Sequence, residues 1–543
     1  MDNRTSRRAA ALIVVLWVVA IIGTITMVFT RQANLALKVS RNINDGNQAK
    51  MLAEAGIYRV MAELVKDGQT GGPDSDKDAW SSNPEAFSDV PLGNGVYRVI
   101  RPDSTTEGAV AYGAVDESGK LNINTATRDQ LLRLPNATPE YIDPILDWRD
   151  EDDTPGEFGA EIDYYQSLPE PCLPKNGLFD SVEELLLVKG ITLDLLYGED
   201  TNTNGILDLN ENDGDKIYPL DNNDGKLDRG WYPFLTAYSY DKNLSSEGED
   251  RVNINTADKE KLTQEFGDVL TEQEIDAIIS VRGQQEFASV GELLNKSAAG
   301  SSGGGNTGGG EATSNGGNQN RNTRGGNRNS GGGNRGNRGL TDEGRFTWDE
   351  TGSAQTRDRS AGGNQSGRGR PASSFSRSGG SNSSGGGRGN ASRGGGSGQS
   401  NQTSQPAPGS SNSISISRDK LKQIIDRISV TDEEKLTGRI NINTAPREVL
   451  RCLIGDNENL IDDILEYRES SKGPFNDIGG LLDVSGVTDE IFQQIANSIC
   501  AKSCVFSARS TGYILNSRAY KEIYAILDRG ISPPGIRVWK VTR

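Results

Sequence analysis

The sequence of 543 residues contains no histidine. Histidine is the side chain that most often acts as a general base near neutral pH, and it is the commonest nitrogen ligand of transition metals. Ser-His-Asp, Cys-His and zinc–histidine chemistry are therefore excluded. Cysteine is also scarce: the four cysteines are too few to hold a small fold together, and their spacing leaves one pair, two pairs or free buried thiols all open.

Positive charge is scarce relative to negative charge. The chain has 58 Lys and Arg against 76 Asp and Glu, a formal net charge of −18. A surface that neutralises duplex phosphates needs clustered Lys and Arg, so no nucleic-acid partner is expected. A hard cation is the ligand that suits this balance better.

Apolar residues nearly disappear between residues 297 and 413, where Gly, Ser, Asn and Arg dominate. Such a composition buries too little apolar surface to offset chain entropy, so the tract is predicted to be disordered. Arg/Gly-rich tracts can bind RNA, but we favour a solvated insertion loop that is attracted to the acidic remainder of the chain or to other envelope polyanions.

Long apolar runs are also rare, and the one long example lies at the start. Ala9 to Phe29 carries no charge, and at ~1.5 Å per residue a helix of that length reaches roughly across the ~30 Å hydrocarbon core of a bilayer. A cleavable secretion signal would have a shorter apolar region of about 7 to 15 residues. Arg4, Arg7 and Arg8 place the preceding tail in the cytoplasm by the positive-inside rule. Apolar positions at helical spacing continue to about Val65, which predicts one long helix, half of it in lipid.

The middle of the chain contains an internal repeat. LNINTA begins at Leu121, VNINTA at Val252 and ININTA at Ile440, and each is followed by two helix-like runs. The Asn side chain is expected to turn the strand and the Thr to cap the following helix. We interpret the three as helix-hairpin-helix-like units. Their hairpins lack a glycine pair and carry acidic residues where phosphate would approach, so structural packing is favoured over DNA binding.

Both ends of the chain outside the repeats predict strands. Residues 95–103 and 108–124 alternate apolar and polar positions around a Gly-rich break, and residues 505–543 do so around Pro533-Pro534-Gly535. A sheet assembled from both ends would have the middle of the chain inserted into it.

A calcium-loop pattern stands between the first two repeats. DTNTNGILDLNE, residues 200–211, fits D-x-[DN]-x-[DN]-G-x5-E at every specified position. Gly205 permits the sharp turn at loop position 6, and the spacing predicts a seven-oxygen shell around calcium. The predicted ligands at loop positions 1, 3, 5, 7, 9 and 12 are Asp200, Asn202, Asn204, the carbonyl of Ile206, Asp208 and Glu211.

Two further acidic stretches are weaker candidates for calcium. NDGDKIYPLDNNDGKLDRGW repeats part of the loop pattern through Asp224 and Asp228, but Leu220 occupies the first ligand position. The second stretch, WRDEDDTPGEFGAEIDYY, crowds carboxylates that repel one another unless they are solvated or neutralised. Its candidate ligands are Asp152, Asp153 and Glu161. No aromatic sugar platform accompanies these carboxylates, so glycoside hydrolysis is not favoured.

Several of these segments resemble one known family. RRAAALIVVLWVVAI and AEAGIYRVMAEL near the N-terminus, and WRDEDD and GLFDSVEELLLVKG further on, resemble the type II secretion minor pseudopilin called general secretion pathway protein K. The resemblance implies a prepilin peptidase cut between Ala9 and Ala10, and calcium bound in an inserted α-helical domain. It also implies partners among the other minor pseudopilins and the major pseudopilin, and an inner-membrane anchor with the body in the periplasm.

The expected fold is α+β: a long N-terminal transmembrane helix and an antiparallel sheet, with a large inserted α-helical domain. The expected function is that of a non-enzymatic minor pseudopilin at the tip of the type II secretion pseudopilus, which helps to initiate pseudopilus assembly and the export of folded proteins. A membrane-anchored helix-hairpin-helix DNA-binding protein is the alternative. The predicted segments are a leader (1–9), the long helix (10–65), the first part of the sheet (66–120), the inserted domain (121–296), the disordered tract (297–413), the third repeat unit (414–500) and the last part of the sheet (501–543).

Overall fold

The structure is a computed structural model that describes residues 3–103, 109–214, 216, 218–219, 221–222, 224–297 and 413–542. Nearly all of the tract predicted to be disordered lies outside these residues, as does Leu220. The domain boundaries given above stay predictions.

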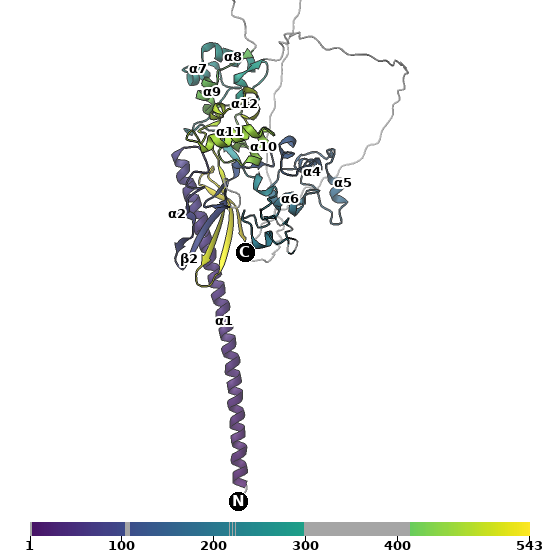
Figure 1. The fold of residues 1–543 in the computed structure, drawn as a ribbon, viewed down its shortest axis with the longest axis vertical. Helices are drawn as coiled ribbons and strands as arrows, with labels where there is room; N and C mark the ends of the chain where they lie inside the picture. Colours follow the sequence, from purple (N-terminus) through teal and green to yellow (C-terminus); the bar gives the residue numbers. More distant parts are fainter. Residues whose placement is uncertain are drawn as a thin grey trace, which may run out of the picture. The chain divides into compact units, whose positions relative to one another are not determined.

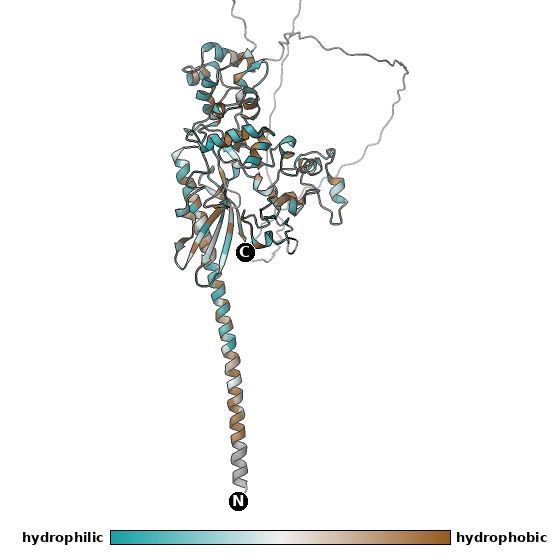
Figure 2. Cartoon of the chain, viewed as in Figure 1, coloured by the Kyte–Doolittle hydropathy of each residue, from teal (hydrophilic) through white to brown (hydrophobic). Residues whose placement is uncertain are grey.

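A single helix, α1 (Asn3–Thr70), occupies the N-terminal part of the chain (Figure 1). Its apolar stretch has a mean hydropathy of 2.8 over its most apolar window and is fully exposed, and the helix is long and apolar enough to cross a membrane. In Figure 2 the ribbon of this stretch is coloured mostly as hydrophobic. Ala9 and Ala10 lie in the first turns of the helix. In its second half, residues 3 or 4 apart face inward, as the sequence predicts for an amphipathic helix: Ala49, Leu52, Ala53, Ile57, Val60 and Leu64.

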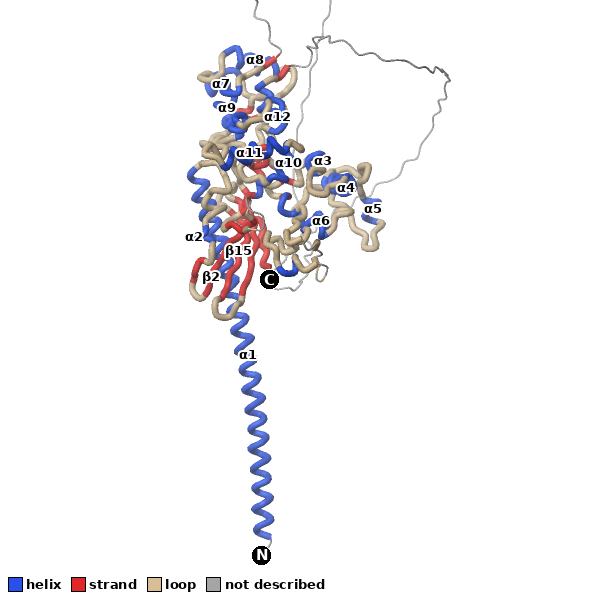
Figure 3. The backbone as a smooth tube through the Cα atoms, viewed as in Figure 1, coloured by secondary structure: helices blue, strands red, loops and turns tan. Residues whose placement is uncertain are grey.

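The second half of α1 packs against a seven-stranded antiparallel sheet made from both ends of the chain (Figure 3). Strand β15 pairs with β2 from the N-terminal part and with β16 from the C-terminal part. The predicted α+β fold is therefore confirmed. The strands are β1 (Val90–Leu92), β2 (Gly95–Pro102), β3 (Val110–Ala111), β4 (Val115–Asp116), β15 (Val505–Ile514), β16 (Tyr520–Asp528) and β17 (Gly535–Thr542).

Small residues let the backbone of α1 approach the sheet closely. A Cβ atom added to Gly512 on β15 would lie 2.1 Å from the carbonyl oxygen of Ala49 and 2.7 Å from the amide nitrogen of Ala53. The aromatic side chains of Trp80 and Phe506 close the same core, with ring centroids 4.8 Å apart. The helix is thus fixed to the sheet by backbone proximity as well as by side-chain burial.

The three INTA segments form three short parallel strand pairs with segments far away in the sequence. Each pair places the strand that begins a repeat unit beside a strand that follows the unit in the sequence. The pairs are β5 (Leu121–Asn122) with β6 (Leu235–Thr236), β8 (Val252–Asn253) with β11 (Ile428–Ser429), and β13 (Ile440–Asn441) with β14 (Ile499–Cys500).

Helices follow each INTA segment, as predicted, and the other elements of the insertion are short. The paired helices are α3 (Arg128–Leu131) and α4 (Pro139–Arg149), α7 (Lys259–Phe266) and α8 (Glu272–Arg282), and α10 (Arg447–Ile454) and α11 (Glu458–Glu469). Outside the insertion, α2 (Pro84–Phe87) precedes β1. The other α-helices and strand pairs of the insertion are α5 (Ile162–Gln166), α6 (Leu193–Tyr197), α9 (Arg418–Ile424), α12 (Asp489–Ile495), β7 (Tyr240–Lys242) paired with β12 (Lys435–Thr437), and β9 (Lys296–Ser297) paired with β10 (Ser413–Ile414).

The same polar contacts hold each unit together. The first Asn of every INTA segment accepts a hydrogen bond from the backbone N–H two residues later, which turns the strand as predicted. The second Asn accepts from the N–H and donates to the carbonyl of a Phe at 2.7–3.0 Å, and these pairs are Asn124 with Phe179, Asn255 with Phe287 and Asn443 with Phe475. An arginine at the end of each second helix donates to INTA carbonyls: Arg149, Arg282 and Arg468.

The expected helix cap was wrong. The INTA threonine does not cap the following helix, because the backbone still turns through two more residues before the helix begins. Thr127 and Asp258 are the caps of α3 and α7, and α10 starts after Pro446 with no side-chain cap. Thr444 instead donates to the buried carboxylate of Asp116 at 2.6 Å, and so joins the third unit to the sheet.

Candidate calcium sites

The loop at residues 200–211 follows α6 and is turned by its own side chains. The Asp200 carboxylate accepts hydrogen bonds from the backbone N–H groups of Asn204 and Gly205, each at 2.9 Å. Two residues have left-handed backbones, Thr203 with φ 55° and Gly205 with φ 70°. The sequence therefore folds this segment into a tight turn whose polar side chains point inward.

The predicted ligands are brought together at the centre of this turn. The side-chain amides of Asn202 and Asn204 both reach one oxygen of Asp208, at 2.8 and 3.0 Å. Ile206 lies in the same turn, where its N–H donates to the Asn204 side-chain oxygen at 2.6 Å. Glu211 closes the turn, because one of its oxygens accepts from the N–H of Asp208 at 3.0 Å.

The burial and hydrogen bonding of Glu211 indicate whether a cation would fit the turn. Its side chain is 1% exposed, and its other oxygen, Oε1, has no hydrogen-bond partner among the described residues. Burial, and then the negative charges of Asp200, Asp208 and Glu199, raises the pKa of Glu211 to about 7. A buried, unpartnered carboxylate oxygen beside two other carboxylates is the arrangement that a hard, oxygen-seeking cation would neutralise, so these residues fit calcium.

The weaker loop at residues 222–228 has the same local geometry, offset by 20 residues. The Asn222 oxygen accepts the N–H of Asp224 at 2.8 Å, and its amide donates to Asp228 at 3.0 Å, as Asn202 does with Asn204 and Asp208. The position equivalent to Glu211 is Trp231, which is buried in the core. This loop therefore has no glutamate of its own at its end.

Glu199 takes the place of the missing glutamate. It accepts the N–H of Asp228 at 2.9 Å, just as Glu211 accepts the N–H of Asp208. It is 4% exposed, and burial raises its pKa. The sequence analysis missed Glu199 because the residue precedes the first loop, and only the contact between the two loops brings it to the second.

The third acidic cluster differs partly from the predicted set. Asp150, Asp152 and Glu161 each have a carboxylate oxygen within 4.8 Å of the others, whereas Asp153 accepts a hydrogen bond from Asn176 at 3.0 Å. Asp150 is thus an added candidate ligand. Glu161 is 4% exposed, and neither of its oxygens has a partner within the described chain. Burial, followed by the charges of Asp147 and its acidic neighbours, raises the pKa of Glu161 to about 7.

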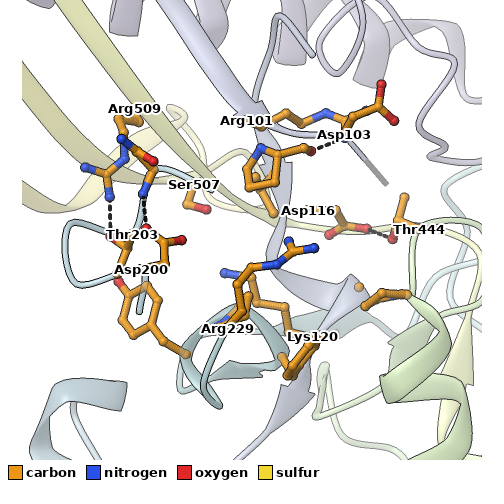
Figure 4. A pocket seen from close by; sticks show the side chains of 18 of the residues that line it. Arg101, Asp103, Asp116, Lys120, Asp200, Thr203, Arg229, Thr444, Ser507 and Arg509 are labelled. Atoms are coloured by element: carbon orange, nitrogen blue, oxygen red, sulfur yellow. Dashed lines mark hydrogen bonds between the residues drawn. The ribbon is translucent and has the colours of Figure 1, made fainter. Parts of the chain in front are cut away.

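The first loop also forms one wall of a cavity of about 470 Å³ against the sheet (Figure 4). Asp200 and Thr203 line it together with residues of β2, β4, β15 and β16. Arg509 on β15 donates to the Thr203 hydroxyl, and Arg229 lines the same cavity. The loop therefore contacts the sheet directly.

Comparisons with known proteins bear on the identity of this chain. The family model described as type II secretion system protein K matches residues 118–197, and a helix-hairpin-helix motif model matches residues 437–500. A protein named type II secretion system protein K, from Pectobacterium carotovorum subsp. carotovorum, is 28% identical over 203 residues. Over these residues the chain is similar to type II secretion system protein K.

The matches to protein K relatives cover parts of each chain. The Pectobacterium alignment covers 35% of this chain and 61% of the relative. A second relative, from Escherichia coli strain K12, provisionally bears the same protein name and is 24% identical, with 35% of this chain and 60% of the relative covered. The chain thus spans about 60% of the length of these two proteins. A crystal structure of the GspK-GspI-GspJ complex from enterotoxigenic Escherichia coli matches with 10% identity, a TM-score of 0.39, and coverage of 93% and 99% of the two chains.

The protein K match includes only one of the candidate calcium clusters. Asp150, Asp152 and Glu161 lie inside residues 118–197, whereas the two loops that follow α6 lie beyond it. Among the described residues, α1 supplies one apolar helix long enough to span a membrane, as a single-pass membrane protein requires.

Proposed function

We propose that this chain is a minor pseudopilin that sits at the tip of a type II secretion pseudopilus. There it helps to initiate assembly and the export of folded proteins across the outer membrane, as a structural component without catalytic activity. The observation that carries the proposal is α1: its second half is buried on the sheet, while every described side chain from Leu12 to Ile43 is exposed. An exposed helix with an uncharged apolar stretch of this length requires lipid or neighbouring helices around that stretch.

The same helix supports the proposed location and partners. Its apolar start is placed in the inner membrane with the body in the periplasm, since Arg4, Arg7 and Arg8 precede it. Prepilin peptidase is proposed to cut between Ala9 and Ala10, so that the mature chain begins at the start of the apolar helix. Once extracted from the bilayer, the helix would pack beside those of the major pseudopilin and the other minor pseudopilins.

The tip position rests on the size of the insertion. The chain leaves the sheet after β4 (Val115–Asp116) and returns only at β15 (Val505–Ile514). A subunit in the middle of a fibre needs room for another subunit above it, and three repeat units leave little. An end position avoids that conflict.

Photo-crosslinking tests the proposed packing of α1. Benzoylphenylalanine introduced in place of Val39, which is 49% exposed, is expected to capture a pilin-like subunit in cells that assemble the secretion system. The same group in place of Leu178, a 63% exposed residue of the insertion, is the matched control and is expected to give no such adduct. Mass spectrometry identifies the captured chain. If Val39 gave no adduct with any pilin-like protein, the pseudopilin role would be refuted.

We further propose that calcium is bound by the loop at residues 200–211, and by the clusters around Asp228 and Glu161. The support is that Glu211 and Glu161 bury carboxylate oxygens without partners next to other carboxylates. When bound, calcium would supply positive charge that neutralises these groups and so rigidifies the acidic loops. Asp200, Asn202, Asn204, Ile206, Asp208 and Glu211 would hold the first ion, Glu199 would join Asp224 and Asp228 at the second, and Asp150, Asp152 and Glu161 would hold the third.

The DNA-binding alternative is favoured by one observation, the helix-hairpin-helix match at residues 437–500. The hairpin between α10 and α11 argues against it. Arg447 and Arg451, the cations beside it, pair with Glu458 at 3.0 and 2.7 Å, and Asn457 occupies the N–H of Leu460. These two cations and this N–H group therefore already have partners within the chain. Salt-dependent binding of duplex DNA by the full chain would support this alternative, and no binding at low salt would remove it.

A further inference from the structure

The calcium loop at residues 200–211 is attached to the pseudopilin sheet through the turn between its ligands. Thr203 and Gly205 are the two left-handed residues of that turn, and neither is a side-chain ligand in the predicted calcium set. Both lie against the sheet. The Thr203 hydroxyl accepts a hydrogen bond from the Arg509 guanidinium, and Gly205 packs on the ring of Pro102 at the end of β2.

The contact with Pro102 leaves no space for a side chain at residue 205. A Cβ atom built on Gly205 would lie 2.4 Å from Cγ of Pro102. The backbone of the loop therefore lies against the end of β2, and a change in the curvature of the turn must move it toward or away from the strand. The curvature is set by the residues that would surround the ion, because Asp200 binds the N–H groups of Asn204 and Gly205 on either side.

Arg509 is rigidly held and presents a fixed donor to the loop. Its guanidinium pairs with Glu522 on β16 at 2.5 Å and lies over the ring of Tyr524, 5.6 Å from the centroid. Its side chain is 12% exposed. Because these contacts fix Arg509 on the sheet, the hydrogen bond to Thr203 fixes the loop relative to the sheet (Figure 4).

We propose that Arg509 is a positioning residue for calcium binding, and that calcium bound in the loop fastens the inserted segment to the pseudopilin sheet. This inference rests on the calcium binding proposed above. Without the ion, Asp200, Asp208 and Glu211 repel one another and the turn opens. With it, the turn adopts the curvature that lets Thr203 meet Arg509 and Gly205 meet Pro102. Coupling is reciprocal: the contact must strengthen calcium binding by the factor by which calcium strengthens the contact.

The test measures the calcium affinity of the full chain in detergent. The parent protein for this test carries Glu161→Gln and Asp228→Asn, which each remove a proposed carboxylate ligand from one of the other two clusters. Thr203→Val keeps the β-branched shape and removes the hydroxyl, and Arg509→Gln removes the guanidinium. Each is expected to weaken calcium binding by about tenfold, as the loss of one charge-assisted hydrogen bond implies. Combining them should give little further loss, because both act through the same bond. Arg509→Lys should restore part of the affinity.

Arg98→Gln is the matched control for Arg509→Gln. Arg98 lies on β2 of the same sheet, pairs with Asp89 at 2.5 Å and lies over the ring of Tyr513, but it does not line the cavity. Its replacement is expected to leave calcium affinity within about twofold of the parent protein. Equal affinities for the Arg98 and Arg509 variants would overturn the proposal.

Hydrogen exchange supplies a second measurement. Calcium is expected to slow exchange in peptides that contain residues 101–103 and 507–509 of the parent protein, and Thr203→Val should abolish that slowing. If the parent protein binds no calcium and Glu211→Gln changes nothing, calcium binding at the loop and this inference both fail. If the parent binds calcium but Thr203→Val does not alter affinity or exchange, only the inference fails.

Discussion

Replacing Gly512 with alanine is expected to lower the free energy of unfolding by about 3 kcal/mol, at the upper end of the usual cost of overpacking. The added methyl group would lie 2.1 Å from the Ala49 carbonyl oxygen and 2.7 Å from Cβ of Leu52. The atoms in the way belong mostly to the α1 backbone, which cannot rotate aside as a side chain can. The helix must therefore separate from β15, and the whole core between them loosens. Denaturant unfolding of the full chain, followed by tryptophan fluorescence, measures the loss.

Two glycines of α1, on the other side of the same contact, calibrate this prediction. Gly46 has nothing within 4 Å of an added Cβ, so Gly46→Ala is expected to stabilise the helix by up to about 1 kcal/mol. Gly56→Ala would meet the Ser510 hydroxyl, which has no hydrogen-bond partner among the described residues and can rotate away, so its cost should be intermediate. If Gly512→Ala unfolded at the same denaturant concentration as Gly46→Ala, the close helix–sheet contact would be disproved.

The long helix and the sheet strands could be predicted because their patterns are local. The residues of α1 that face the sheet are spaced 3 or 4 apart, and the buried residues of β2 alternate along the strand. The pairing of INTA strands with segments more than 50 residues away could not be predicted, because two-residue strands carry no periodicity. The threonine cap was wrong for a local reason: in each unit the helix begins after two further residues, so that Thr127 and Asp258 cap α3 and α7.

In the candidate sites too, ligands that lie close together in the sequence could be predicted, and a ligand from another segment could not. In the loop at residues 200–211, the spacing of residues along one turn determines which side chains converge, so Asp200, Asp208 and Glu211 could be identified from sequence. Glu199 could not, because it serves the second loop across a contact between the two. A 20-residue repeat reveals Trp231 where a glutamate is needed, but it does not say which residue replaces that glutamate.

Calcium is expected to raise the melting temperature of the full chain, and to raise it more at pH 7.5 than at pH 5.5. Glu161 and Glu211 have folded-state pKa values of about 7, above the ordinary value of 4.5. In the absence of calcium, the folded state therefore binds more protons than the unfolded state between pH 4.5 and about pH 7. Their contribution to stability is fully present below pH 4.5 and is lost as the pH rises through about 7. With a chelator present, the protein should melt at a lower temperature at pH 7.5 than at pH 5.5.

The stabilisation by calcium depends on pH in the opposite direction, because calcium binds the ionised carboxylates. Protons compete with the ion at pH 5.5 and little at pH 7.5, so the stabilisation by calcium grows with pH, to about 2.7 kcal/mol per site when free calcium is a hundredfold above its Kd. Other buried acids, such as Asp74 with a pKa of about 8, titrate with and without the ion, and the difference between the two curves removes their contribution. Glu161→Gln and Glu211→Gln should each abolish part of that difference. If calcium shifted melting equally at both pH values, protonation of these two carboxylates would not compete with the ion, and they would not be its ligands.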